Sequence, residues 1–260
     1  MLHAKAMTAA EPLKRFKVAL ARHGDEVREA QRLRWRVFVE EQGARLVSPQ
    51  PGLDIDPYDA HCEHLIVRDC ATDTVVGTYR LLTNAAAKAA GGFYSEQEFD
   101  LAPLAPLRPG MVEMGRSCVH PSYRGGVIIT LLWSGLGAFL ATTRANTLIG
   151  CASIPMHDGG HHAVSVYAAV MKTHLSAREH RVRPHHPLPL AGLDSSGDAT
   201  PPPLIKGYLR AGAVICGAPA WDTDFNTADL FMMLELDRLE QRTARHFRQP
   251  AGSIAENVAA

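Results

Sequence analysis

Residues 113–126 read Glu-Met-Gly-Arg-Ser-Cys-Val-His-Pro-Ser-Tyr-Arg-Gly-Gly, and the apolar run Val127 to Ala141 follows them directly. This order predicts a strand, a turn and a helix, because a proline and paired glycines separate two apolar segments. Such a turn presents main-chain N–H groups at a helix N-terminus, which favours a phosphate-bearing ligand. Glu113 and Arg116 could supply acid–base chemistry and charge pairing beside that ligand.

Composition predicts one large globular domain. A chain of 260 residues with 46% hydrophobic content can bury a substantial core. The 27 basic and 27 acidic residues balance, so no global charge favours nucleic acid. Residues 1–50 carry ten basic against six acidic side chains. That excess could bind an acidic protein partner, although a solvated helix face is the simpler interpretation.

Five widely spaced cysteines, with no Cys-x-x-Cys pair, predict buried thiols in a reducing compartment. The N-terminus has no apolar core long enough for a signal peptide, and Thr130, Ser134, Gly135 and Gly137 interrupt the longest apolar run. We therefore expect a cytoplasmic protein.

Periodicity along the chain predicts alternating helices and strands. We expect an amphipathic helix over Glu26 to Glu41, then a β-hairpin of Glu63 to Arg68 and Val75 to Leu82. A loop rich in proline and glycine, Val47 to Asp59, separates them and would leave its aspartates as movable groups on the solvent side. Farther along, we expect a strand over Thr147 to Ile154 and a helix over His162 to Glu179.

This order predicts an α/β fold with a mixed, largely antiparallel central sheet flanked by helices. We expect a flexible N-terminal segment over 1–24 and one domain over 25–240. That domain contains a long loop at 184–203, a length more typical of functional than of incidental loops. Residues 241–260 read as a C-terminal tail.

Four blocks along the chain resemble conserved blocks of the acyl-homoserine-lactone synthases, which share the fold of the Gcn5-related N-acetyltransferases (GNAT). These blocks are Leu33-Arg34-Trp35-Arg36-Val37-Phe38, Asp54-Ile55-Asp56 with Tyr58-Asp59, Gly77-Thr78-Tyr79-Arg80-Leu81-Leu82, and Glu113-Met114-Gly115-Arg116. Three later blocks more closely resemble the ornithine N-α-acyltransferases and the related N-acyl amino acid synthases. They are Ile149-Gly150-Cys151-Ala152-Ser153, Lys206-Gly207-Tyr208-Leu209-Arg210-Ala211-Gly212-Ala213 and Phe225-Asn226-Thr227-Ala228-Asp229.

The resemblance implies transfer of a fatty acyl chain, 3-hydroxylated in that family, to the α-amine of L-ornithine in ornithine lipid synthesis. The alternatives are an N-acyl amino acid synthase for another amino acid, an acyl-homoserine-lactone synthase, or a catalytically silent scaffold that binds acyl carrier protein. Because the product is lipophilic, peripheral contact with the inner membrane is a further hypothesis.

One departure from the GNAT pattern bears on the acyl donor. Coenzyme A enzymes of this fold carry a turn like Arg-Gly-x-Gly-x-Gly, whose glycines let the backbone approach the pyrophosphate. Here Val127 and Ile129 replace the second and third glycines. The single phosphate of a phosphopantetheine arm demands less of this turn. We therefore expect the acyl-phosphopantetheine of acyl carrier protein as the donor, and no permanently bound cofactor.

The predicted site combines residues from all these segments. Glu113 is the expected base and Arg116 or Arg80 the partner of the substrate carboxylate, although Glu113 could simply pair with one of these arginines. Further substrate-binding candidates are Arg34, Phe38, Asp54, Asp56 and Asp59; the three aspartates could receive the cationic side chain of ornithine. Candidates for phosphopantetheine binding are Val119, Arg124, Gly125 and Gly126.

Two other chemistries are weaker alternatives. Strand spacing places Cys118 and His120 on one face, which permits a Cys/His nucleophile, but no third orienting group is evident. His157, His161 and His162 suggest a metal, but the pair Gly159-Gly160 interrupts the alignment and no further ligands complete a site. We expect no metal.

Overall fold

The computed structural model describes residues 15–238, so the expected tail at 241–260 lies outside the described residues. The strands are β1 (Phe16–Leu20), β2 (Glu63–Asp69), β3 (Thr74–Thr83), β4 (Phe99–Asp100), β5 (Met111–Val119), β6 (Thr147–Pro155), β7 (Arg183–Pro184), β8 (Val214–Ile215), β9 (Ala220–Asp222) and β10 (Thr227–Glu235). The helices are α2 (Gly24–Trp35), α3 (Asn84–Ala90), α4 (Val127–Ala141), α5 (His161–His174) and α6 (Pro203–Arg210).

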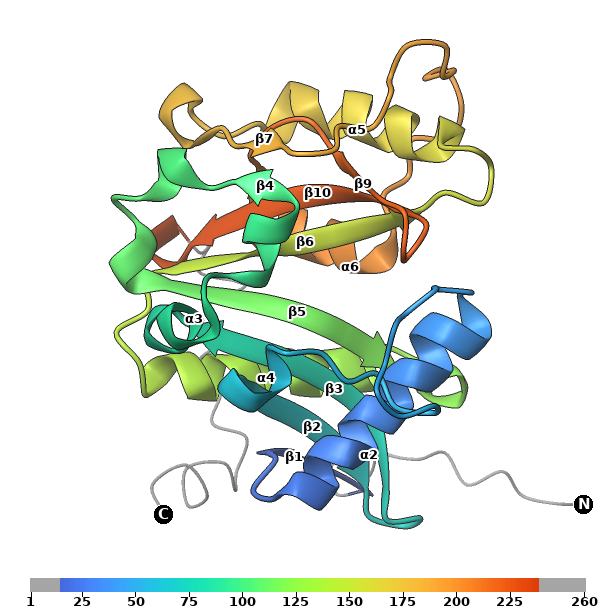
Figure 1. The fold of residues 1–260 in the computed structure, drawn as a ribbon, viewed down its shortest axis with the longest axis vertical. Coiled ribbons are helices and arrows are strands. Elements are labelled where there is room, and N and C mark those ends of the chain that lie inside the picture. Colours follow the sequence, from blue (N-terminus) through green and yellow to red (C-terminus); the bar gives the residue numbers. More distant parts are fainter. Residues whose placement is uncertain (1–14, 239–260) are drawn as a thin grey trace, which may run out of the picture.

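One twisted sheet organises the domain (Figure 1), in the order β1-β2-β3-β5-β6-β10-β8, with β9 also paired to β10. Every pairing in this sheet is antiparallel except that of β5 with β6. The mixed, largely antiparallel sheet flanked by helices is therefore confirmed. No helix among residues 15–238 is long and apolar enough to cross a membrane.

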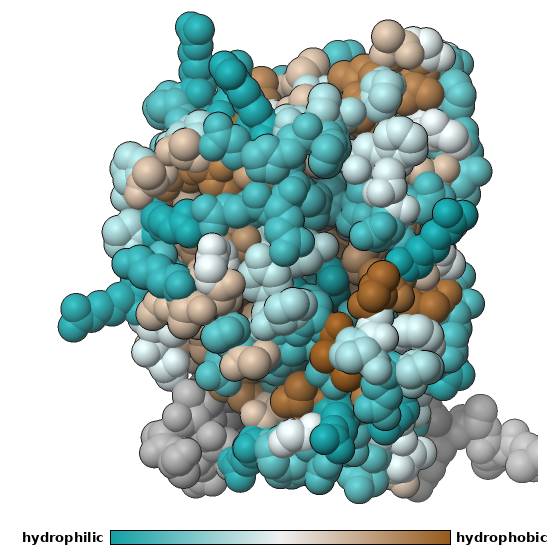
Figure 2. All heavy atoms as spheres, in the orientation of Figure 1, coloured by the Kyte–Doolittle hydropathy of each residue, from teal (hydrophilic) through white to brown (hydrophobic). Residues whose placement is uncertain are grey.

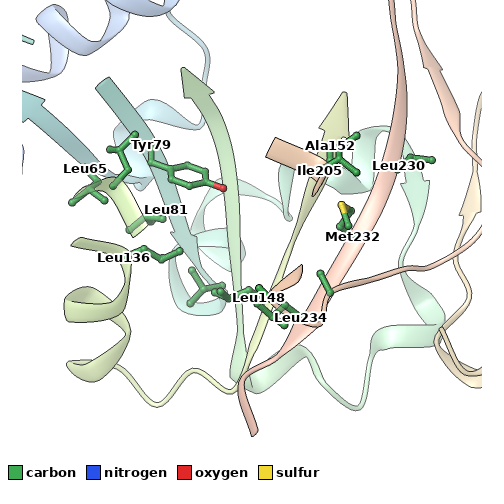
Figure 3. Close-up of a cluster of buried hydrophobic side chains, with 14 of the residues drawn as sticks. Leu65, Tyr79, Leu81, Leu136, Leu148, Ala152, Ile205, Leu230, Met232 and Leu234 are labelled. Atoms are coloured by element: carbon green, nitrogen blue, oxygen red, sulfur yellow. The ribbon is translucent and has the colours of Figure 1, made fainter. Parts of the chain in front are cut away.

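Strand alternation explains why helices cover both faces of the sheet. Leu65 and Val67 point to the face that packs on α4, whereas Ile66, between them, packs with Leu33 of α2 on the other face. Figure 3 shows the first of these cores, with Leu136 of α4 beside Leu65 and Leu81. The sheet is consequently buried on both sides near β3.

The N-terminal boundary is a correction. The expected flexible segment over 1–24 contains β1, and Phe16 through Leu20 pair antiparallel with Asp69 through Leu65. Its sequence alternates polar and apolar residues over only five positions, too short a pattern to distinguish from an irregular segment. The predicted hairpin corresponds to β2 and β3. The predicted first helix corresponds to α2 and the π-helical turn Arg36–Glu41 that continues it.

The long loop is tied to the rest of the domain. No helix or strand lies between Pro184 and Pro203, as predicted. His161 Nδ1 accepts a hydrogen bond from the main-chain N–H of Asp194 at 2.9 Å, and His162 Nδ1 lies 3.0 Å from the carbonyl oxygen of Asp198. These histidines therefore connect α5 to the loop, which accounts for them without a metal.

The parallel pair β5 and β6 is short, and the two strands then diverge (Figure 1). Their register joins Met111 through Glu113 to Thr147 through Ile149 and ends there. At the divergence, Gly150 approaches β5 so closely that an added Cβ would lie 2.3 Å from the carbonyl oxygen of Met114. Only glycine fits this contact.

We predict that Gly150→Ala lowers the free energy of unfolding by about 1–3 kcal/mol, because the new methyl group must displace main-chain atoms. Urea denaturation measures the change. Gly115→Ala is the matched control, since a Cβ there meets nothing within 4 Å. Equal stability of the Gly150 variant and wild type would contradict the close contact.

Candidate active site

A cavity of about 280 Å³ occupies the space between the diverging halves of β5 and β6. Met114 through Ser117 form one wall, and Cys151, Ser153 and Pro155 of β6 form the opposite one. The remaining lining residues come from other segments: Phe38, Gln42, Tyr79, Arg80, Leu82, Tyr94, Glu113, Pro202, Leu204, Tyr208, Asp222, Phe225, Thr227 and Asp229. The stretch 113–116 thus lies in this cavity.

A buried ionic network lies beside the cavity. Arg34 of α2 is fully buried and pairs through Nε with Asp54 Oδ2 at 3.0 Å and through Nη2 with Asp59 Oδ2 at 2.7 Å. Arg80 of β3 pairs with Asp56 and, at 3.0 Å, with Asp59 Oδ1. Burial opposes ionisation of Asp59, but Arg34 and Arg80 outweigh it and hold its pKa well below the usual range.

This network corrects the prediction for the acidic loop. Asp54 and Asp59 are buried, not movable groups in solvent, and each already pairs with an arginine of the protein. Arg34 does not line the cavity. Asp54, Asp59 and Arg34 therefore pair with one another beside the cavity and are not among its lining residues, while Asp56 is bound between two arginines, Arg80 and Arg116.

Arg116 occupies a strained position on β5. Its φ of 50° lies in the left-handed region, where the register between β3 and β5 shifts by a bulge. The guanidinium pairs with Asp54 at 3.2 Å and Asp56 at 3.3 Å. It lies 4.9 Å from the ring centroid of Tyr94 and 4.6 Å from that of Phe225. These contacts fix a planar, charged donor group at the cavity wall.

Glu113 is buried where β5 and β6 part. Its carboxylate accepts hydrogen bonds from the main-chain N–H of Tyr94 at 2.6 Å and of Ser95 at 2.8 Å, and from the hydroxyl of Ser95. Burial raises its pKa, although the bonds from Ser95 and Tyr94 oppose that change. No ion pair joins it to Arg80 or Arg116 among the described residues, so the simple charge-pairing interpretation is wrong.

The predicted phosphate turn lies at the N-terminus of α4. Gly126 precedes the helix with a φ of 89°, which explains the glycine there. Arg124 forms a forked pair with Glu41 and donates through Nε to the carbonyl oxygen of Val119 at 3.2 Å. Val119, Arg124, Gly125 and Gly126 therefore lie together, outside the set of residues that line the cavity.

Phe38 and α6 complete the walls of the cavity. Phe38 packs edge-on against Phe225 with ring centroids 5.6 Å apart. Tyr208 of α6 hydrogen-bonds to the hydroxyl of Tyr79 and stacks on Trp133 of α4. These contacts hold α6 against the open side of the diverging strands.

The Cys/His alternative does not fit the structure. The Cys118 thiol is buried against α2, and burial raises its pKa to about 12. His120 Nδ1 accepts a hydrogen bond from the main-chain N–H of Ser122 at 3.2 Å and so caps the turn after β5. A thiolate nucleophile is strongly disfavoured at this position.

Known proteins are similar to this chain in sequence and in fold. Residues 33–134 match the family model of the acetyltransferase (GNAT) domain. The chain is 36% identical to the L-ornithine N(alpha)-acyltransferase of Rhizobium meliloti, covering 92% of this chain and 86% of that protein. The corresponding Rhodobacter capsulatus enzyme is 33% identical, with coverage of 90% and 95%.

The chain belongs to the L-ornithine N(alpha)-acyltransferase family.

Solved structures agree on the fold of this acyltransferase. The acyl-homoserine lactone synthase BjaI, solved with MTA, superposes with a TM-score of 0.54 at 15% identity, covering 91% of this chain and 90% of that chain. FeeM, an N-acyl amino acid synthase from uncultured soil microbes, gives 0.52 at 14% identity, with coverage of 86% and 92%. At these identities the similarity establishes the fold alone.

An acidic wall of the acyltransferase cavity was absent from the predicted site. Asp222 and Asp229 line the cavity together with Cys151. The carboxylate of Glu98 lies within 4.8 Å of the Asp229 carboxylate and of the Cys151 thiol. Asp229 belongs to the block 225–229 that resembles the ornithine N-α-acyltransferases. That resemblance was the one feature of the sequence that pointed to a residue of this wall.

Proposed function

We propose that this protein transfers a fatty acyl chain from the thioester of acyl carrier protein to the α-amine of L-ornithine. The observation that carries the proposal is the cavity where β5 and β6 diverge. It combines a buried carboxylate with raised pKa, Glu113, with a fixed guanidinium, Arg116, and with an acidic wall. A zwitterionic acceptor with a second ammonium group complements these charges, and the relatives named above carry this activity in their names.

In the proposed reaction, Glu113 accepts a proton from the α-ammonium of the acceptor, directly or through a water molecule. The neutral amine attacks the thioester carbonyl carbon and the C–S bond breaks. The thiolate leaves with the second proton that the nitrogen loses, and Glu113 releases its own proton to solvent. A base whose pKa is raised suits this step. We assign stabilisation of the oxyanion to main-chain N–H groups of the bulge at Arg116 and Ser117, which have no register partners on β3.

Arg116 is the proposed partner of the acceptor carboxylate. A guanidinium has five N–H donors, so Arg116 keeps donors for a substrate carboxylate besides its ion pairs with Asp54 and Asp56 and its hydrogen bond with Tyr94. Arg80 pairs with Asp56 and Asp59 and thereby stabilises the position of Asp56, which also pairs with Arg116. We propose that the network sets the position of Arg116 and thereby of the substrate.

The phosphopantetheine phosphate is proposed to lie at the N-terminus of α4. The residue before the helix, Gly126, has no side chain that could cap the first main-chain N–H groups of α4, and such N–H groups favour a phosphate. From there the arm would run between β5 and β6 towards Glu113. A small apolar cavity of about 20 Å³ shares Met114, Cys151 and Tyr208 with the site and continues to Met232. Flexible methionines there could yield to an acyl chain.

Acyl carrier protein is proposed to dock on exposed arginines of the first helical segment. Arg28, Arg32 and Arg36 follow one another at four-residue spacing on α2 and its π-helical extension, and all three are exposed. Much of the face seen in Figure 2 is hydrophilic, with hydrophobic patches between, and the exposed arginines would add positive charge for an acidic partner.

We predict that the double variant Arg32→Glu with Arg36→Glu raises KM for acyl carrier protein about tenfold or more, since like charges replace a complementary surface. Steady-state kinetics at two salt concentrations measure the effect, which should weaken as salt rises. Lys172→Glu, an exposed charge reversal on α5, is the control. An unchanged KM in the double variant would place docking elsewhere.

A reconstituted reaction tests the proposed function. The purified protein is incubated with 3-hydroxyacyl carrier protein, or with the corresponding acyl-coenzyme A, and a panel of amino acids and homoserine derivatives, and products are identified by mass spectrometry. We expect N-acylornithine, formed faster from the carrier protein. A product with another amine alone would identify a different synthase, and carrier binding without product would identify a scaffold.

A further inference from the structure

Glu98 has an unusual environment for a carboxylate. Both of its carboxylate oxygens are shielded from solvent. Among the described residues, the only hydrogen-bonding group beside them is the thiol of Cys151, which is a weak donor. Asp229 is buried beside it, with one carboxylate oxygen bound by the hydroxyl of Thr227 at 2.7 Å. Two carboxylates thus lie side by side in an enclosed place, and one of them, Asp229, lines the cavity. Burying an uncompensated pair of this kind is costly and calls for a counter-charge.

The protein supplies no such counter-charge within residues 15–238. No ion pair there joins Glu98 or Asp229 to a basic side chain. The positive charge of Arg116 acts on both carboxylates, but its guanidinium forms ion pairs with Asp54 and Asp56 instead. Burial raises the pKa of Glu98 and of Asp229, and repulsion from nearby carboxylates raises both pKa values further. The charged and titratable groups facing this pair include Asp222, Cys151, Arg116 and Tyr94.

We propose that Glu98 and Asp229 bind the side-chain ammonium of the acceptor, a primary alkylammonium at the end of a short methylene chain. Asp222, at the cavity wall, adds negative charge near the same place. This assignment rests on the proposed function and adds to it the residues that distinguish ornithine from amino acids with neutral side chains. A primary ammonium has three N–H donors and can bridge two carboxylates.

The arrangement also separates the two amines of the acceptor. The Ser95 hydroxyl donates to Glu113 and lies 3.3 Å from the Cys151 sulfur, and Cys151 in turn adjoins Glu98 and Asp229. Ser95 and Cys151 therefore connect the proposed base to the acidic pair through consecutive contacts. An acceptor extended between them presents its α-amine to Glu113 while its terminal ammonium remains charged and unreactive.

A divalent metal ion fits this cluster less well than an ammonium. The third group is the Cys151 thiol, and burial raises its pKa well above the ordinary value, so a thiolate ligand is disfavoured. Two carboxylates alone provide few of the ligands that oxygen-seeking cations require.

Two conservative variants and a substrate pair test the proposal. The variants are Glu98→Gln and Asp229→Asn, and the substrates are ornithine and 2-aminopentanoate, which is ornithine without its terminal ammonium. We expect kcat/KM for ornithine to fall about 10- to 100-fold in each variant, while kcat/KM for 2-aminopentanoate stays equal or rises. Asp224→Asn is the control, because Asp224 lies near Asp222 in the chain but is exposed. Unchanged discrimination in both variants would overturn the proposal and leave the proposed function intact.

A binding measurement separates this proposal from the acyl-transfer reaction. Titration calorimetry with 1,4-diaminobutane, in two buffers of different ionisation enthalpy at neutral pH, should show binding with proton release by wild type, because the raised pKa values keep a proton on the pair until the ammonium displaces it. Binding should be lost in Glu98→Gln. Loss of that binding supports the ammonium site even if no acylornithine forms. Binding retained in both variants, or binding that requires added metal and disappears with EDTA, would contradict it.

The variants should remain folded. A carboxylate whose pKa is raised on folding destabilises the native state as pH rises from its unfolded pKa towards its folded one. Removing the charge of Glu98 or Asp229 should therefore leave the melting temperature at neutral pH equal to that of wild type or higher. A large fall would indicate a structural role for the pair and would count against an ammonium site.

Discussion

Replacing Glu113 by glutamine is expected to lower kcat about 10²–10⁴-fold, the usual contribution of a general base. The amide of the new side chain cannot accept the proton of the acceptor ammonium, although its shape still fills the space between β5 and the turn at Tyr94 and Ser95. Single-turnover rates of acyl transfer with a saturating donor provide the measurement. Near-normal turnover would exclude Glu113 as the base.

Ser95→Ala separates the proposed role of Glu113 as a base from its role as a hydrogen-bond acceptor for this turn. The hydroxyl of Ser95 lowers the pKa of Glu113, so its removal should raise that pKa further. Because the base must be ionised, the acidic limb of the rate–pH profile should move to higher pH, with little change in the maximal rate. A profile that falls at every pH without shifting would indicate only a structural role.

Replacing Arg34 by methionine is expected to lower the free energy of unfolding by about 3 kcal/mol, because the buried carboxylates Asp54 and Asp59 each lose one of their two arginine partners. Arg34 is fully buried, so solvent cannot compensate. Urea denaturation provides the measurement. The control Arg32→Met, on the exposed face of α2, should change stability by no more than about 0.5 kcal/mol.

The same variant tests whether Arg34 contacts the acceptor, as its sequence block suggested. In the structure it orients the loop that carries Asp54 and Asp59, so the folded fraction of the variant should lose activity through a displaced network. A stable Arg34→Met protein whose only defect is a higher KM for ornithine would contradict this and restore Arg34 as a substrate ligand.

The sequence predicts the order of elements here because their local patterns are strong. The β-branched runs of β2 and β3, and the paired glycines before α4, are signals that do not depend on distant contacts. The stretch 113–116, which the sequence places at the centre of the predicted site, lines the cavity in the structure. It could be found because charged side chains inside a strand of a buried sheet are rare.

The sequence could not predict where the acidic loop lies. Proline and glycine in residues 47–59 indicate the absence of regular structure, and that says nothing about exposure. Three arginines from three separate elements hold Asp54, Asp56 and Asp59, and only the folded sheet brings those arginines together. Local composition cannot encode such a contact.

The acidic wall was missed for a related reason. Glu98 precedes the short β4, Asp222 ends β9, and Asp229 lies in β10, so more than a hundred residues separate the first from the others. Each is unremarkable in its own segment. The antiparallel pairing of β10 with β9 brings Asp222 and Asp229 to one side of the cavity, and the packing of Phe99 against Phe231 brings the neighbouring Glu98 beside β10.

The position of the acyl group on the product tests the account most directly. Tandem mass spectrometry of the product from ornithine and 3-hydroxyacyl carrier protein distinguishes acylation of the α-amine from acylation of the terminal amine. We predict acylation of the α-amine alone, because in the proposed arrangement Glu113 faces that amine while Glu98 and Asp229 hold the other as an ammonium. Acylation of the terminal amine, or an equal mixture of both products, would contradict the proposed arrangement of the site.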